Sequence, residues 1–246
     1  MIWASDMNQT SLFPLWVKVG VNFPAIESSR EEPLIEELIA QTSVIGRYEP
    51  RLIECMAGWI AKHGDLINTS LMHKYISQGN SAVLGLIFDI LETKQSDKLK
   101  NLLKYCMPNE KAEMLFHAAE NSPTMKAEAI KKEIDINRKW NLYYVSLRIK
   151  TDAILNRQIV LKNNPKLARR VLFGTVMRTE ILNYLLERKT SFPAEIANHF
   201  GYQYHRVIEE IQNLIGVGVI FDSHSSKKRI LKLSPSFEKY LNIIPW

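Results

Sequence analysis

The sequence predicts a mostly α-helical protein in which a helical N-terminal domain precedes a smaller C-terminal domain that ends in a β-hairpin. Three observations favour this fold class. Apolar residues recur at helical spacing along most of the 246-residue chain, only 10 residues are glycine, and two short β-like runs lie near the C-terminus. The composition, 46% hydrophobic and 24% charged, is that of a chain long enough and apolar enough to bury a full core.

The sequence also limits where the protein is expected to work. No apolar run approaches the roughly 20 residues that a membrane-spanning helix needs. No basic residue precedes Lys18, so the opening does not resemble a secretory signal. Cys55 and Cys106 are the only cysteines, too few for a disulfide framework. We therefore expect a cytoplasmic protein with no membrane partner, and leave open a single bridge between these two cysteines.

Three segments are predicted along the chain. Residues 1–28 carry few helix signals and are expected to form an N-terminal arm, in which the alternating "LWVKV" run predicts a short edge strand. Residues 29–165 are predicted to form the helical domain, and residues 166–246 the C-terminal domain. The boundary is placed at Pro165 because proline disfavours a helical conformation in the residue before it.

Within the helical domain, residues 31–92 predict several short helices, two of which end near Gly46 and Gly64. Residues 125–160 contain neither glycine nor proline, and their apolar spacing predicts one long helix or two abutting helices. Such a helix could wrap the bundle, connect the domains, or pair with a second copy of the chain, and we favour the last, which predicts a homodimer. The domain is also a candidate site for a small-molecule effector or a protein partner.

The C-terminal domain predicts three helices and a hairpin. A first amphipathic helix follows the domain boundary, a second begins at Pro193 and ends at Gly201, and a third begins near Gln203. Glycine at position 201 suits the tight turn between the last two helices, since it adopts left-handed backbone angles without a Cβ clash. The expected inward positions of the three helices are Val176, Ile181, Leu182, Leu185 and Leu186, then Ile196, Ala197 and Phe200, then Val207, Ile208, Ile211, Leu214 and Ile215. The expected hairpin pairs Val217, Val219 and Phe221 with Ile230, Leu231 and Leu233.

Four motifs, "LFGTVMRTEILNYLL", "AEIANHFGY", "RVIEEIQNLIGVGVI" and "KKRILKLSP", occur in this order. Over about residues 170–240, a third of the chain, they resemble the winged helix-turn-helix domain of bacterial and archaeal transcriptional regulators. The resemblance implies that the third helix enters the major groove of double-stranded DNA and that the hairpin contacts the backbone or the minor groove. It also implies transcriptional regulation by a dimer.

Basic residues are concentrated in the same domain. Residues 166–246 hold 12 Lys and Arg against 7 Asp and Glu, whereas the first 165 residues are close to neutral. A basic domain suits a polyanionic partner, although the same charges could serve solubility alone. The candidate DNA-binding residues are Tyr202, Gln203, Tyr204, His205, Arg206, Lys227, Lys228, Arg229 and Arg178.

Four further charged residues belong to the same part of the sequence. Arg169 and Arg170 are candidates for additional phosphate contacts. Glu209 and Glu210 oppose DNA binding if they face phosphates, unless they pair with Arg206, accept a hydrogen bond from cytosine or mark a protein-binding face.

Sequence motifs for catalysis are not found. The chain has no glycine-rich phosphate loop, no G-x-S-x-G sequence and no H-E-x-x-H pair, and its six histidines lack metal-ligand spacing. We therefore expect no enzyme activity, no metal and no cofactor. The competing interpretation is an adaptor, or an antitoxin-like protein, whose C-terminal domain docks a protein partner instead of DNA.

Overall fold

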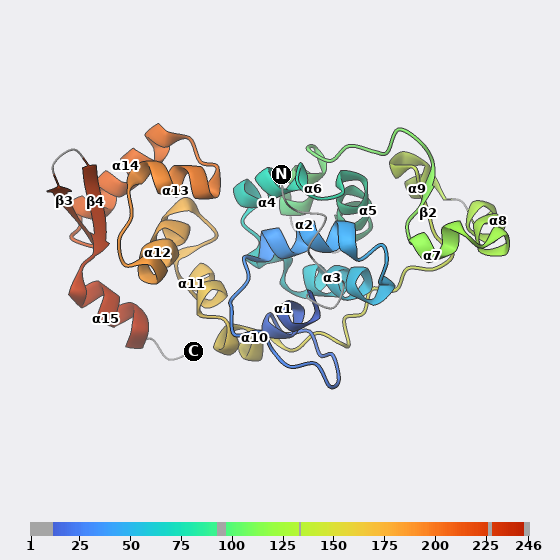
Figure 1. The fold of residues 1–246 in the computed structure, drawn as a ribbon, viewed down its shortest axis with the longest axis horizontal. Coiled ribbons are helices and arrows are strands. Elements are labelled where there is room, and N and C mark those ends of the chain that lie inside the picture. Colours follow the sequence, from blue (N-terminus) through green and yellow to red (C-terminus); the bar gives the residue numbers. More distant parts are fainter. Residues whose placement is uncertain (1–11, 93–96, 133, 226–227, 244–246) are drawn as a thin grey trace. The chain divides into compact units, whose positions relative to one another are not determined.

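The computed structural model describes residues 12–92, 97–132, 134–225 and 228–243, which are mostly helical (Figure 1). Two small sheets are present in these residues: a parallel pair in the N-terminal half and an antiparallel pair near the C-terminus. Internal contacts divide the chain into two compact units, Met1–Asn164 and Pro165–Trp246. We call them the N-terminal unit and the C-terminal unit.

The N-terminal unit is a set of short helices with one two-residue parallel sheet. Its elements are α1 (Leu12–Lys18), α2 (Ile35–Ile45), α3 (Pro50–His63), the 3-10 turn η2 (Gly64–Leu66), α4 (Thr69–Ile76), α5 (Ser81–Glu92), α6 (Asp97–Leu103), β1 (Glu113–Met114), α7 (His117–Glu120), α8 (Pro123–Lys131), α9 (Asp135–Trp140), β2 (Leu142–Tyr143) and α10 (Arg157–Asn163).

The core of this unit is built around α5, which contacts α2, α3, α6 and α9. Every residue of α5 from Ala82 to Phe88 is buried, so this helix is apolar on all sides, as expected of a helix enclosed by others. Gly85 makes one of these contacts possible, because a Cβ atom there would lie 2.2 Å from the ring of Trp140 on α9.

The predicted short helices of residues 31–92 are confirmed. Helix α2 is followed by Gly46, and α3 is followed by Gly64, as the glycine positions indicated. The Asn68 side chain caps α4 by accepting hydrogen bonds from the backbone N–H groups of Ser70 and Leu71. Such a cap satisfies backbone donors that have no partner within the helix.

The strand predicted in "LWVKV" is wrong, because these residues belong mainly to helix α1. Leu12 and Trp16 lie four residues apart on one helical face and are both fully buried. The indole N–H of Trp16 donates to Thr42 Oγ1 on α2 at 2.9 Å, which fixes α1 against the core. Five alternating residues are too few to separate a strand from a helix that buries an aromatic side chain.

The long helix predicted over residues 125–160 is also wrong. Asn141 takes a left-handed conformation, with φ 51° and ψ 38°, and ends α9. Asparagine tolerates this conformation better than most residues, so the absence of glycine did not guarantee a continuous helix. The following residues pair with β1 as strand β2, and the Lys150 N–H then donates to the Glu54 carbonyl of α3 at 3.3 Å. Tertiary contacts therefore override helical spacing here, and the homodimer loses the helix on which its prediction was based.

The C-terminal unit contains five helices and one hairpin in its described residues. They are α11 (Pro165–Phe173), α12 (Met177–Arg188), α13 (Pro193–Phe200), α14 (Tyr204–Gly216), β3 (Ile220–Ser225), β4 (Lys228–Leu233) and α15 (Pro235–Ile243). Gly174, with φ 86°, separates α11 from α12. Val176 consequently precedes α12 and is 48% exposed, so its predicted place in the core is wrong.

The predicted hairpin is confirmed, but its inward face is shifted. Strand β3 begins at Ile220, which is buried and pairs with Leu233, whereas Phe221 is 54% exposed and pairs with Lys232. Because side chains alternate along a strand, a one-residue shift moves the whole set to the other face. On the other side of β4, Ser191 and Leu231 exchange two backbone hydrogen bonds, of 3.2 and 2.8 Å, which attach the segment before α13 to the hairpin.

Candidate nucleic-acid interface

Helix α14 packs on α12 and α13, while α12 contacts strand β4 and α14 contacts strand β3 of the hairpin (Figure 1). The inward positions predicted for α13, Ile196, Ala197 and Phe200, are all buried. On α14, Val207, Ile211 and Leu214 are buried in the same way, while Ile208 and Ile215 are half-buried. These contacts bury one side of α14 and leave the other side to solvent.

The turn between α13 and α14 is built as the sequence indicated. Gly201 has left-handed backbone angles, φ 70° and ψ 26°, and its N–H donates to the Ala197 carbonyl. The Tyr202 N–H donates to the same carbonyl at 3.0 Å, and the Tyr202 ring stacks on Phe200 with centroids 5.6 Å apart. Such hydrogen bonds satisfy carbonyls at a helix end and fix the direction in which the next helix leaves.

A polar network anchors the start of α13. The Glu195 carboxylate accepts hydrogen bonds from the Ser191 hydroxyl at 2.8 Å and the Tyr184 hydroxyl of α12 at 3.0 Å. The hydrogen bond from Ser191, with further help from Tyr184, holds the pKa of Glu195 below its usual value. Burial raises the pKa of Tyr184, and its bond to Glu195 adds to that shift. The network connects α12, the segment before α13, and α13 itself.

The first turn of α14 is exposed and polar. Gln203 is the last residue before the helix, and Tyr204, His205 and Arg206 are its first three residues. All four are exposed to solvent. This turn has no acidic residue, and Arg206 forms no ion pair within the described part of the chain. Since a helix N-terminus carries partial positive charge, its field and the Arg206 guanidinium both attract an anion.

The hairpin candidates are placed less completely. Lys227 lies outside the described residues, and for Lys228 only the backbone, in β4, is described. Arg229 donates from Nε to Asp222 Oδ2 at 2.9 Å, so its charge is balanced within the hairpin. Lys232 was not among the sequence candidates, although it is exposed on the outer face of β4. The alternation of "RILKL", with Leu231 and Leu233 buried, is the signal that would have identified it.

Arg178 lies near α14 but is already engaged. It donates from Nε to Glu210 Oε1 at 2.5 Å, and the side chains are 51% and 20% exposed respectively. Glu210 therefore pairs with Arg178 of α12 rather than with Arg206. The pair leaves little net charge at this point of the surface.

The phosphate contacts predicted for Arg169 and Arg170 are wrong, because both side chains are buried. Arg170 forms an ion pair with Glu180 at 2.9 Å, in which the two side chains are 2% and 3% exposed. Arg169 donates to Asn183 Oδ1 at 2.5 Å. A buried guanidinium needs such partners to offset its desolvation, so these arginines connect α11 to α12 and do not reach a ligand.

Several basic residues of the C-terminal unit are thus paired with acidic residues of the same unit, although this pairing leaves the unit's net positive charge unchanged. Besides these pairs, Lys189 binds Glu238 at 2.6 Å and Lys166 pairs with Glu187. Arg206 is an exception: it is a predicted site residue whose charge stays available.

Other kinds of site find no support in the part of the chain that the structure describes. No group of three histidine, cysteine or acidic residues there is arranged to hold a metal ion, and no helix there is long and apolar enough to cross a membrane. Cys55 and Cys106 are separate, buried thiols. Burial raises the pKa of Cys55 to about 11 and that of Cys106 to about 12, which keeps both protonated at neutral pH.

No protein-family model matches the chain, and no curated protein or solved structure shows significant similarity to it.

The two kinds of arginine should respond differently to substitution. Arg170→Met leaves the Glu180 carboxylate buried without its partner, and we expect a loss of about 3–5 kcal/mol in the unfolding free energy of the C-terminal unit. Arg170→Met combined with Glu180→Leu should recover most of this loss. Urea unfolding followed by helicity and by amide hydrogen exchange in α12 measures both.

Arg206→Ala is the matched control, because Arg206 is exposed and forms no ion pair with any residue that the structure describes. Its effect on unfolding should stay within about 0.5 kcal/mol. Equal losses of unfolding free energy from Arg170→Met and Arg206→Ala would contradict this account, in which Arg170 stabilises the fold and Arg206 does not.

Proposed function

We propose that the C-terminal unit is a winged helix-turn-helix domain that binds double-stranded DNA, and that the protein regulates transcription. Helix α14 would lie in the major groove and the β3–β4 hairpin would contact the flanking backbone. The proposal is made for a single chain, since the helix expected to form a dimer is not present.

One observation carries the proposal: in the exposed first turn of α14, Arg206 has no ion pair with a described residue, and its neighbours are polar side chains that the core does not require. Arginine can bind guanine through two hydrogen bonds or contact a phosphate, and Gln203 can bind adenine in a comparable way. The hydroxyl of Tyr204, which is 55% exposed, can donate to a phosphate. The order of α12, α13, α14 and the hairpin supports the same proposal, because it places this turn at the start of the third helix.

The compensated charges define how strong the binding should be. Arg178 and Arg229 are held by Glu210 and Asp222, so two of the candidate DNA-binding residues already have an anionic partner. Affinity for unrelated DNA should then be modest, and contacts near Arg206 should have a large share in binding.

The test is fluorescence anisotropy of the full chain with genomic-upstream and random duplexes at ~50 and ~200 mM salt, a range over which phosphate-dependent binding weakens strongly. We expect salt-sensitive binding that Arg206→Gln weakens about tenfold, since a contact of this kind contributes roughly 1–3 kcal/mol. Lys239→Gln removes the same charge from the exposed surface of α15 and should change affinity less than twofold. Equal effects of the two substitutions would show that only net charge matters, contrary to the proposal.

The Arg178–Glu210 pair gives a second test with the opposite sign. Glu210→Gln removes a negative charge from α14 and releases Arg178, so DNA affinity at ~50 mM salt should rise about two- to fivefold, the size of a surface ion-pair effect. Glu238→Gln is the control. It breaks the ion pair between Glu238 of α15 and Lys189 and should leave affinity unchanged. A fall in affinity with Glu210→Gln would mean that the carboxylate itself binds a base, as an acceptor from cytosine would.

An adaptor function is the second candidate, and two exposed apolar residues favour it. Val217 at the end of α14 is 74% exposed and Phe221 on β3 is 54% exposed. An apolar protein interface at these residues would be nearly insensitive to salt, unlike phosphate binding. Absence of DNA binding at both salt concentrations would therefore favour the adaptor.

A further inference from the structure

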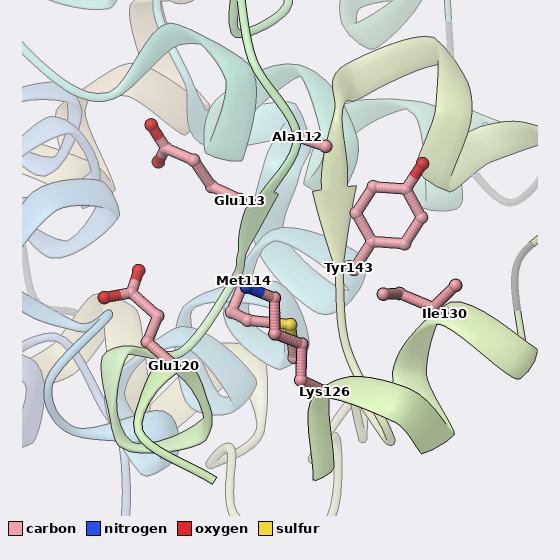
Figure 2. A pocket seen from close by; sticks show the side chains of 7 residues that line it. All are labelled: Ala112, Glu113, Met114, Glu120, Lys126, Ile130 and Tyr143. Atoms are coloured by element: carbon pink, nitrogen blue, oxygen red, sulfur yellow. The ribbon is translucent and has the colours of Figure 1, made fainter. Parts of the chain in front are cut away.

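A second candidate site lies in the N-terminal unit, in the small sheet and the helices next to it. A pocket of about 420 Å³ opens there, beside β1, α7, α8 and β2 (Figure 2). Its volume is within the range of small-molecule sites. Its lining combines two carboxylates, Glu113 and Glu120, one ammonium, Lys126, and an apolar part formed by Met114, Ile130 and Tyr143.

The two carboxylates are held by one buried arginine. Arg47, which follows α2, is 8% exposed and donates from Nη2 to Glu113 Oε2 at 3.0 Å. The same guanidinium donates to the carbonyls of Met114, at 2.8 Å, and Leu115, at 3.2 Å, so it also fixes β1. Glu120 Oε1 lies 3.8 Å from Arg47 Nη2.

This arrangement leaves acceptors for a cation. His117 Nδ1 lies 3.1 Å from Glu120 Oε1, the oxygen that also faces Arg47. In the described part of the chain, Glu113 Oε1 and Glu120 Oε2 have no hydrogen-bond partner. One guanidinium between two carboxylates leaves one negative charge, and side chains held in this way lose little freedom when they bind a ligand. Figure 2 shows both carboxylates on the same side of β1.

The other charged group of the pocket is Lys126 on α8. It is exposed and forms no ion pair with any described residue. A ligand carboxylate would therefore meet an ammonium that is not already neutralised. With Arg47 included, the pocket holds two positive and two negative side chains, so its charges are separated but balanced.

The apolar part of the pocket is built by β1, β2 and α8. Met114 is 4% exposed and packs with Tyr143, while Ile130 of α8 is 51% exposed although it is a large apolar side chain. Figure 2 shows Tyr143 and Ile130 together, on the opposite side of β1 from the two carboxylates. An apolar ligand group placed there would cover Ile130 and leave the charged groups for the polar end of the ligand.

We propose that this pocket binds a small zwitterion, an α-amino acid with an apolar side chain. The ammonium of the ligand would bind Glu113 and Glu120, its carboxylate would bind Lys126, and its side chain would contact Met114, Ile130 and Tyr143. A simple amine leaves Lys126 without a partner, and a simple carboxylic acid faces two carboxylates. This inference does not depend on DNA binding by the C-terminal unit.

The test is calorimetric titration of the full chain with L-phenylalanine, L-leucine and L-methionine near neutral pH. At least one should bind with a Kd of about 1 mM or tighter, as expected of a ligand of this size. Phenethylamine lacks the carboxylate and 3-phenylpropionate lacks the ammonium, and each should bind at least tenfold more weakly than L-phenylalanine, because each loses a charge-assisted contact.

Substitutions test whether the amino acid binds in this pocket. Lys126→Gln and Glu113→Gln should each weaken the amino acid at least tenfold. Lys131→Gln, which changes the same charge on the same helix outside the pocket, should leave the Kd unchanged. Because Glu113 also contacts Arg47, the melting temperature of its variant is compared with that of the unmodified protein, and Lys126→Gln, at an exposed side chain, carries the test if the Glu113 variant unfolds.

Methyl-labelled methionine gives an independent readout. The Met114 signal, assigned through Met114→Leu, should shift on titration. No binding of the three amino acids, or binding that leaves the Met114 signal unmoved, would overturn the proposal. Equal affinity for phenethylamine and L-phenylalanine would also overturn it, because the pocket would then select only a cation.

Discussion

Burial of one side of α14 determines which residues of the C-terminal unit a partner can reach. Val207, Ile211 and Leu214 are held against the rest of the unit, and Gly201 gives the chain the sharp turn that this packing requires. Once these contacts are made, the first turn of α14 must face solvent with Arg206 at its end. A ligand surface thus follows from core packing.

Electrostatics then reduces the list of available groups. Sequence alone shows a basic C-terminal domain, but in its described residues five of the 12 Lys and Arg side chains pair with an acidic side chain of the same domain. The buried Arg170–Glu180 pair connects α11 to α12, and Arg178–Glu210 and Arg229–Asp222 are ion pairs nearer the surface. An exposed arginine that stays unpaired is therefore more informative than the net charge of the domain, because a paired cation attracts a second anion only weakly.

Local patterns were enough to predict much of the fold but little of the site chemistry. Helices α2, α3, α13 and α14 have regular apolar spacing and end near glycine, so their existence and inward faces could be predicted. The α8–α9–β2 region could not, because its breaks depend on Asn141 and on contacts with β1 and α3. The prediction placed the wrong side chains of β3 toward the core. Alternate positions in "VGVIF" all lack polar side chains, so alternation alone cannot show which set faces inward.

Which charged side chains pair with one another is harder still to predict from the sequence. Arg169 and Arg170 are buried while Arg206 is exposed, and nothing in their immediate neighbours separates them. The pocket of the N-terminal unit is an example at longer range, since Arg47 and Glu113 are 66 residues apart in the chain. Such contacts arise only when the elements are packed together, so a sequence identifies the residue types available to a site and not their partners.

Hydrogen exchange of the full chain, with and without a bound duplex, tests the central claim most directly. Amide exchange reports which backbone segments a ligand covers or rigidifies. The account predicts that DNA slows exchange mainly in residues 202–208 and in β4, with little change in α15. Protection centred on the N-terminal unit, or binding without protection at the start of α14, would contradict the claim that this turn is the DNA-binding surface.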